Sequence, residues 1–213
     1  MRQIIYVKYN RTRSEKFQLK TAIVRENGAL SVEKTALTEA GAGHMGSFWE
    51  KYQMIREQNP RIRFLEPEFK DGGKTVCFRY LEGETLADAL ADRIHMGQIP
   101  YEELERVMAL VFPEDFSVDS GHFSIKEQTG GPFAPSQGFI EVFGPVPEGL
   151  EELGRLTAAP NVDGLFENLM ISDGHVYGID YEWVFDMEIP ARFLHYRNLL
   201  YFYRRCEASV SSA

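Results

Sequence analysis

The first third of the chain alternates apolar and polar residues with the period of β-strands. Residues 4–9, 17–24 and 30–37 are rich in β-branched, aromatic and other apolar side chains. The polar, basic stretch 10–16 suits a turn, and Asn27-Gly28 is the dipeptide most typical of a two-residue hairpin. The pattern therefore predicts an antiparallel meander of three strands.

A helix and two more strands are predicted next. Ser47 and Glu50 have the spacing of a helix capping box, and residues 61–65 and 74–80 are typical of short strands joined by a turn at 71–73. The helix would carry an apolar stripe made of Phe48, Tyr52 and Ile55. The predicted sheet therefore has five strands.

The rest of the chain is predicted to be mostly helical. Thr85 caps a second helix, residues 112–147 show no sustained period, and residues 148–156 suggest a short helix. Two short strands surround a tight turn at Asp173-Gly174, and an aromatic-rich helix runs from Pro190 to about Cys206. This order of elements predicts an α+β fold.

Composition excludes several classes of protein. With 213 residues, 44% of them hydrophobic, the chain is large enough for a real core, and its net charge of -9 argues against a nucleic-acid binder. Cys77 and Cys206 lie far apart, outside any zinc-binding or disulfide pattern. The strand-like start does not resemble a signal peptide, and no apolar run reaches the roughly 18 residues of a membrane span. We therefore expect a cytoplasmic protein.

Three polar side chains suggest a chemistry. Asp163 and Asn168 stand five positions apart before a short strand, and Asp180 ends the second strand of the following hairpin. Phosphoryl transfer needs a carboxylate that orients the attacking hydroxyl and oxygen ligands that hold magnesium. The same residues also allow a structural interpretation, with Asp163 as a helix cap and Asn168 as a turn residue. Asp180 fits that interpretation least, because a carboxylate after an apolar strand is costly to bury without a cation.

Two segments resemble a known family. Residues 161–168 and 177–183 resemble the catalytic and metal-binding segments of aminoglycoside phosphotransferases and choline kinases. Residues 179–185, with Pro190, Tyr196 and Arg197 beyond them, look closer still to kinase-like domains attached to bacterial glycosyltransferases and methyltransferases of surface-polysaccharide synthesis. The resemblance implies a two-lobed protein-kinase-like fold, with residues 1–82 as the N-lobe and residues 83–213 as a reduced helical C-lobe.

The resemblance also implies roles for single residues of the C-lobe. Asp163 would be the catalytic base or hydroxyl-orienting group, and Asn168 and Asp180 would bind magnesium. Glu182 would add a contact to a second metal ion or to a metal ligand.

In the N-lobe, Lys34 matches the lysine that pairs with the α- and β-phosphates of ATP. Glu50 would be its ion-pair partner, with Glu39 as a competitor for that role. The segment from Tyr80 through Glu82 resembles the hinge that offers backbone hydrogen bonds to adenine.

The chain departs from the family at three places. Asn161 stands where a histidine is usual, Asp180-Tyr181-Glu182 replaces Asp-Phe-Gly, and the turn at 10–16 contains no glycine. Arg11, Arg13 or Lys16 would have to contact phosphate instead, without the close approach that glycine allows.

The sequence therefore predicts an ATP- and magnesium-dependent phosphotransferase. Its acceptor would be a hydroxyl of a sugar, a glycan terminus or another small molecule, since about nine residues between Asp180 and Pro190 leave little room for a peptide platform. The alternative is a non-catalytic pseudokinase module that binds nucleotide or scaffolds a partner enzyme. In either case the chain would be part of, or partner to, a glycosyltransferase or methyltransferase.

Overall fold

The computed structural model describes residues 1–98, 101–126, 133–146, 154–158 and 160–210. It consists of two compact units. The first unit comprises Met1–Arg56 and Phe64–Glu82, and the second comprises Glu57–Arg63 and Gly83–Ala213. Each unit is described by itself below.

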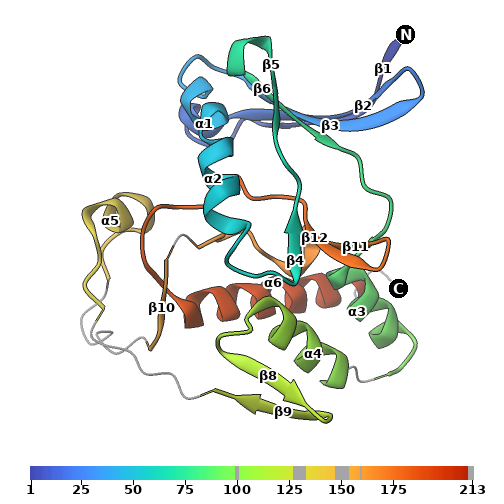
Figure 1. The fold of residues 1–213 in the computed structure, drawn as a ribbon, viewed down its shortest axis with the longest axis vertical. Helices are drawn as coiled ribbons and strands as arrows, with labels where there is room; N and C mark the ends of the chain where they lie inside the picture. The colour runs from blue at the N-terminus through green and yellow to red at the C-terminus, as the bar shows by residue number, and fades with distance from the viewer. Residues whose placement is uncertain (99–100, 127–132, 147–153, 159, 211–213) are drawn as a thin grey trace. The chain divides into compact units, whose positions relative to one another are not determined.

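The first unit is built on a five-stranded antiparallel sheet, which confirms the predicted α+β class (Figure 1). The strands follow the order β1-β2-β3-β6-β5. Their bounds are β1 Arg2–Asn10, β2 Leu19–Glu26, β3 Ala29–Ala36, β5 Glu68–Lys70 and β6 Thr75–Arg79. Asn27 and Gly28 have φ angles of 51° and 86°, as the predicted hairpin turn between β2 and β3 requires.

One predicted strand of this sheet is wrong. Residues 61–65 were expected to pair within it, but β4 (Ile62–Phe64) belongs to a different sheet, of order β4-β12-β11-β7. The fifth strand is β5, because the turn η2 (Asp71–Gly73) folds the chain straight back onto β6. All three turn residues have positive φ, which keeps this hairpin tight.

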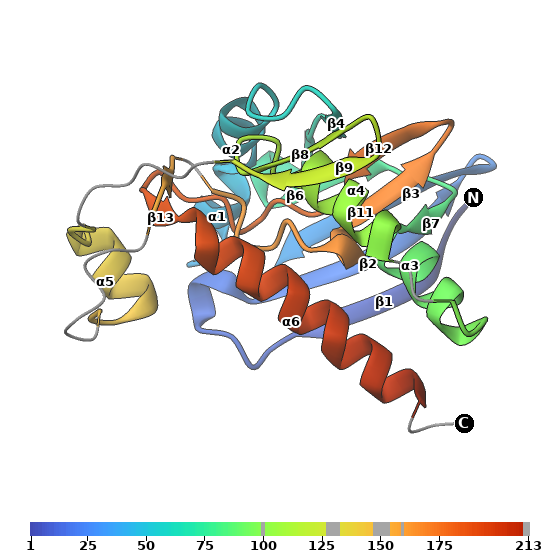
Figure 2. The ribbon, with the colours of Figure 1, turned by 90° about the horizontal axis from the view of Figure 1, so that it is seen from below.

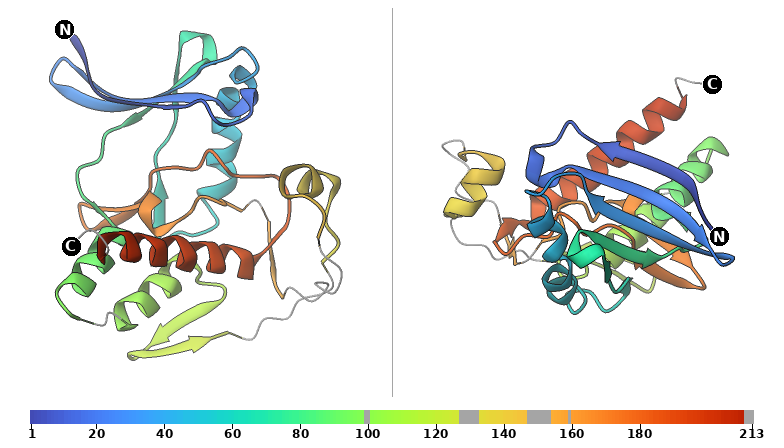
Figure 3. Two further views of the ribbon diagram at one scale, coloured as in Figure 1. Left: turned by 180° about the vertical axis from the view of Figure 1, so that it is seen from behind. Right: turned by 90° about the horizontal axis from the view of Figure 1, so that it is seen from above.

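Short helices cover one face of the sheet. Helix α1 (Ala42–Gly46) contacts β3, and the Phe48 ring at the start of α2 (Phe48–Ile55) lies 6.0 Å from the Phe78 ring on β6. A one-turn helix, η1 (Glu15–Phe17), precedes β2. Figure 3 shows this sheet from above and from behind.

The predicted capping box at the start of α2 is not formed. Ser47 Oγ donates to His44 O at 2.9 Å instead of accepting from the first turn of α2. The reason is that α1 ends directly before Ser47, which has helical φ and ψ of -78° and 0° rather than the extended backbone of a capping residue.

The second unit combines helices with small sheets (Figure 2). Thr85 caps α3 as predicted, since its Oγ1 accepts from Asp88 N at 3.0 Å. The helices are α3 Leu86–His95, α4 Tyr101–Val111, α5 Gln137–Phe143, η3 Phe166–Asn168 and α6 Ala191–Val210. The strands are β7 Glu84–Thr85, β8 Phe116–Asp119, β9 His122–Ile125, β10 Leu156–Thr157, β11 Leu169–Ser172, β12 His175–Gly178 and β13 Ile189–Pro190.

The sequence pattern gave part of this unit. The hairpin around Asp173-Gly174 is present as β11–β12, and the predicted C-terminal helix is α6. The predicted helix at 148–156 lies mostly outside the described residues, and Leu156 begins β10. Helix α4 was not predicted, and neither was the β8–β9 hairpin within a stretch expected to be loop. No helix among the described residues is long and apolar enough to cross a membrane.

A buried carboxylate joins three distant parts of the second unit. Asp115 is 0% exposed and accepts two hydrogen bonds from Arg155, at 2.7 Å to Oδ1 and 2.6 Å to Oδ2. His195 Nε2 on α6 lies 3.0 Å from the same Oδ2, with its ring packed against Phe112 and Phe116. Burial acts to raise the pKa of Asp115, but the bonds from Arg155 and His195 outweigh it and lower the pKa to about 2.

Asp115 therefore predicts a loss of stability in acid. A carboxylate whose pKa is lower in the folded chain than its unfolded value of about 3.9 stabilises the fold fully above that value. The stabilisation is lost as the pH falls toward the folded pKa of about 2. We expect the free energy of unfolding to fall by about 2 kcal/mol from this group below about pH 4. Urea unfolding followed by circular dichroism across this pH range measures the effect.

Asp115→Asn should remove this part of the pH dependence. It should also cost about 3–5 kcal/mol near neutral pH, because Arg155 keeps its charge and loses its carboxylate. The matched control is Asp119→Asn, at an exposed position on β8, which should keep the wild-type slope. An Asp115→Asn variant with the wild-type slope would show that other groups cause the acid sensitivity.

Candidate functional site

The segment 161–168, here called the Asp163 loop, is bonded to the end of the β11–β12 hairpin. Asn168 Nδ2 donates to Asp163 O at 2.9 Å, which closes the loop upon itself. Asn168 O accepts from Ile179 N at 3.0 Å, directly before Asp180. Asn168 is therefore hydrogen-bonded to Asp163 and to Ile179, the residue before Asp180. The second unit thus brings Asp163, Asn168 and Asp180 into one neighbourhood.

The chain around Asp180 forms a second tight turn. Strand β12 ends at Gly178, two residues earlier than the sequence suggested, and Asp180 Oδ1 accepts from Glu182 N at 3.2 Å. Asn161 Nδ2 donates to Asp180 O at 3.1 Å. Asn161, in the place where the family has a histidine, thus fixes the backbone that carries the predicted metal ligand.

Glu182 occupies an unusual position for a carboxylate. It is only 3% exposed, between the buried residues Tyr181 and Val184. Its backbone N–H donates to Asp180 Oδ1 and so helps to orient the predicted metal ligand.

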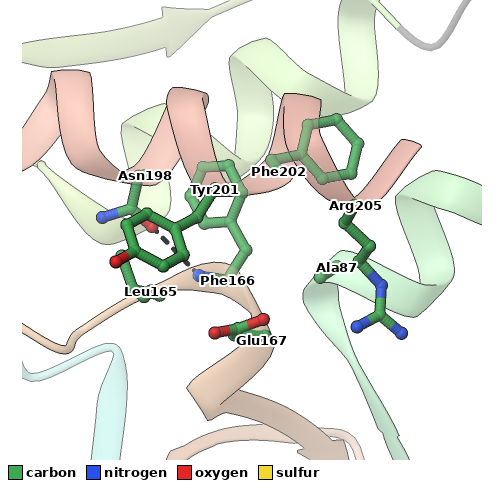
Figure 4. A pocket seen from close by; sticks show the side chains of 8 residues that line it. All are labelled: Ala87, Leu165, Phe166, Glu167, Asn198, Tyr201, Phe202 and Arg205. Carbon is green, nitrogen blue, oxygen red and sulfur yellow. Dashed lines mark hydrogen bonds between the residues drawn. The ribbon is translucent and has the colours of Figure 1, made fainter. Parts of the chain in front are cut away.

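Two adjacent residues of α6 hold the Asp163 loop, and we call them the α6 clamp. Arg197 Nη2 donates to Asp163 Oδ1 at 3.0 Å, and Arg197 Nε donates to Val162 O at 3.2 Å. Asn198 accepts from Phe166 N at 3.0 Å, a bond drawn in Figure 4, and donates to Gly164 O at 3.2 Å. The clamp therefore grips the loop both by its main chain and by the Asp163 carboxylate.

Apolar packing also holds the Asp163 loop in place. Val162 is 6% exposed and packs in a cluster with Ile189 and Leu194. Its N–H donates to Trp183 O at 3.1 Å, so the loop start runs antiparallel to the segment after Asp180. A loop with this support can hold a reacting side chain in a defined position.

The residues present fit a hydrated magnesium ion with few protein ligands. The Asn168 amide nitrogen is used by the bond to Asp163 O, so the amide oxygen is the atom suited to a cation. No three His, Cys, Asp or Glu residues gather as a metal site in the part of the chain that the structure describes. Magnesium commonly takes one or two protein ligands and completes its shell with phosphate oxygens and water, and Asn168 and Asp180 suit that arrangement.

In the first unit, Lys34 lies on the face of the sheet that the helices cover. The strand register pairs Lys34 with Val76 and Val32 with Phe78, and residues paired in this way share a face. Phe48 of α2 packs against Phe78 on that face. Lys34 is 5% exposed, so it is not a solvated strand lysine.

The predicted partner of Lys34 is placed differently. Glu50 lies at an exposed position of α2. Glu39, the competing candidate, is exposed and pairs with Lys74 at 2.8 Å. The buried stripe of α2 is Phe48, Lys51 and Ile55, which turns Glu50 outward. The exposed positions of Glu50 and Glu39 do not support the expectation that either pairs with Lys34, which stays a prediction.

Lys51 takes the inward position on α2. Its ammonium group lies 3.2 Å from His44 Nδ1 and 5.5 Å from the centre of the Phe48 ring. Nothing in the local sequence distinguished Lys51 from a surface lysine. The signal would have been its spacing of three residues from Phe48 and four from Ile55.

The predicted hinge ends the first unit. Tyr80 N donates to Leu30 O at 3.3 Å, its side chain is 37% exposed, and Glu82 is exposed. The next residue, Gly83, lies against the hairpin that follows the Asp163 loop. A Cβ atom at Gly83 would stand 2.0 Å from Ile171 O. Close backbone approach therefore requires glycine at this position.

A small pocket lies beside the α6 clamp (Figure 4). It is lined by Ala87, Leu165, Phe166, Glu167, Asn198, Tyr201, Phe202 and Arg205. Its volume of about 10 Å³ is room for about one water molecule, far below the roughly 300 Å³ at which ligand pockets begin. Arg205 at its edge pairs with Asp88 on α3, so the pocket marks where α3, α6 and the Asp163 loop meet.

Comparisons with known proteins give little further information. No protein-family model matches the chain, and no curated protein does. The crystal structure of macrolide 2'-phosphotransferase MphH from Brachybacterium faecium, an apoenzyme, is similar with a TM-score of 0.38 and 9% identity. The match covers 83% of this chain and 65% of that one, so the chain spans less than two thirds of that enzyme. No family is assigned from this similarity.

Gly83→Ala should destabilise the second unit. The added methyl group would meet the Ile171 carbonyl, a backbone atom of β11, and not a side chain that can move aside. We expect a loss of about 1–3 kcal/mol or more of unfolding free energy, as for overpacked cores. Thermal unfolding measures this.

The control for this variant is Gly43→Ala in α1, where nothing lies within 4 Å of the added atom. It should be neutral or slightly stabilising, because alanine favours a helix more than glycine does. Equal melting temperatures for Gly83→Ala and wild type would contradict the close approach.

Proposed function

We propose that the protein is an ATP- and magnesium-dependent phosphotransferase whose acceptor is a hydroxyl group of a small molecule, sugar or glycan terminus. The observation that carries the proposal is the position of Asn168, bonded through its side chain to Asp163 and through its main chain to Ile179 beside Asp180. This joins a hydroxyl-orienting carboxylate to two oxygen ligands suited to magnesium, which are the groups that phosphoryl transfer needs.

Each residue has a defined task in this proposal. Asp163 accepts a hydrogen bond from the acceptor hydroxyl and orients it, while Asn168 and Asp180 bind the magnesium that accompanies the triphosphate. Magnesium supplies charge neutralisation on the phosphate oxygens when it is bound. Lys34 pairs with phosphate in the proposal, and its burial on the first unit's sheet supports a role other than solubility.

The class of acceptor follows from the chain after Asp180. Val184 pairs with Asn161 in an isolated bridge, and Ile189–Pro190 pairs with β10 directly before α6. Backbone pairing therefore occupies the segment on which a peptide substrate would have to lie. A small acceptor needs no such platform. The sequence resemblance adds to the proposal a relation to a glycosyltransferase or methyltransferase of surface-polysaccharide synthesis.

One observation favours a non-catalytic module as the second candidate. The turn at 10–16 contains no glycine, so its backbone cannot approach a phosphate as closely as a glycine-rich loop does. A pseudokinase that binds nucleotide without turnover, or that serves as a scaffold for a partner enzyme, would tolerate that loss.

Asp180→Asn should weaken the binding of ATP in the presence of magnesium. The substitution removes one negative charge from the predicted metal site and keeps the shape of the side chain, so we expect at least about a tenfold loss, equivalent to 1.4 kcal/mol. Calorimetric titration of ATP with and without magnesium measures it.

The matched control is Asp173→Asn, in the exposed turn of the same hairpin. Its φ of 49° suits asparagine as well as aspartate, so magnesium-dependent binding should stay unchanged. Unchanged affinity in Asp180→Asn would remove Asp180 from the metal site. No binding to the wild-type protein at millimolar ATP would move the function to a scaffold.

Asp163→Asn should abolish turnover and preserve nucleotide binding. The amide cannot take a proton and orients a hydroxyl less strongly, so phosphate transfer should fall by about 100-fold or more. A screen of sugar and glycan acceptors with labelled ATP measures transfer. Turnover at the wild-type rate in this variant would show that Asp163 is not the orienting group.

A further inference from the structure

Arg197 binds the Asp163 loop at two points with one side chain. Its Nη2 donates to Asp163 Oδ1 at 3.0 Å, and its Nε donates to Val162 O at 3.2 Å. The two acceptors belong to consecutive residues, one through its side chain and one through its main chain. A guanidinium held at both points fixes the direction of the carboxylate relative to the loop.

Two aromatic rings flank the guanidinium group of Arg197. Its central carbon lies 5.0 Å from the Tyr201 ring centre and 5.9 Å from the Phe193 ring centre. These rings stand one helical turn after and one turn before Arg197 on α6. Arg197 is only 22% exposed, so the long side chain has little freedom left to lose when Asp163 engages a substrate.

We propose that Arg197 is the positioning residue that aims Asp163 at the acceptor hydroxyl. The inference rests on the proposed function and names the residue that sets the direction of the Asp163 carboxylate. Arg197 donates to Oδ1 of the carboxylate that receives the hydroxyl in the proposal. Arg197 acts there through Asp163 and not on the acceptor or the nucleotide.

The step that Arg197 supports is a simple displacement. The acceptor oxygen forms a bond to the γ-phosphorus of ATP, and the bond between that phosphorus and the oxygen bridging to the β-phosphate breaks. The electron pair leaves with ADP, and the hydroxyl proton passes to the Asp163 carboxylate and then to solvent. Phosphoryl transfer needs little basicity, so the direction of the carboxylate matters more than its strength as a base.

Asn198, the neighbour of Arg197, allows positioning of the Asp163 carboxylate to be distinguished from support of the loop. Asn198 holds the same loop through Phe166 N and Gly164 O but does not touch the Asp163 carboxylate. It is 4% exposed and also donates to Leu194 O at 3.2 Å, so its loss should loosen the loop and lower stability. Arg197 should instead affect turnover more than stability.

The test measures phosphate release from ATP and magnesium with water as the acceptor. In Arg197→Gln, kcat should fall by about tenfold to a hundredfold, the cost of a small misplacement of a reacting group. The KM for ATP should stay within about twofold, since Arg197 contacts no phosphate in the proposal. Arg197→Lys should recover less than half of the lost kcat, because lysine keeps the charge without the fork geometry.

Two further variants complete the experiment. Arg204→Gln, at an exposed position of the same helix, should match wild type in kcat, KM and melting temperature. Asn198→Ala should lower the melting temperature and kcat together. Arg197→Gln with the wild-type kcat overturns the inference, and so does a melting temperature lowered as far as in Asn198→Ala. A wild-type protein that neither binds ATP nor releases phosphate overturns the proposed function itself.

Discussion

The attachment of the Asp163 loop to α6 is the constraint on which the candidate site depends. Residues 161–168 contain a single short turn of helix and the bond from Asn168 to Asp163 O, so the Asp163 carboxylate itself is held by a bond from another element. Arg197 and Asn198 supply four bonds to this loop from the rigid side of a 20-residue helix. The position of Asn168, and through Ile179 that of Asp180, follows from a loop that is already fixed. The site is therefore a property of helix and loop together.

Local patterns predicted the elements that local chemistry controls. The Asn27-Gly28 and Asp173-Gly174 turns have the positive φ angles that their residues favour, and Thr85 caps α3. The predictions for residues 61–65 and for Ser47 were wrong. The sheet of β4 depends on the strand that it pairs with, and the backbone of Ser47 depends on the helix α1 that precedes it. A strand of three residues carries too little pattern to name its neighbour, and a serine cannot cap a helix when its own backbone is already helical.

The sequence predicted the polar residues of the candidate site. It did not predict the residues that hold them in place. The order of Asp163, Asn168 and Asp180 along the chain suggested phosphoryl transfer, and the structure brings the three into one neighbourhood of the second unit. Glu50 is exposed on α2 because Lys51, one position further along, takes the inward place. Arg197, Gly83 and Asp115 act through residues more than 30 positions away, and no window of sequence displays such contacts.

The late position of the α6 clamp in the chain has a consequence for synthesis. A ribosome adds about 5–20 residues per second, so Arg197 follows Asp163 by about 2–7 s. During that interval the nascent Asp163 loop exists without the bonds that order it, and the Asp115 carboxylate waits longer, about 4–16 s, for His195. The second unit can therefore gain its site only after translation has passed α6, and a chain interrupted before that helix would carry the three polar residues without the geometry that joins them.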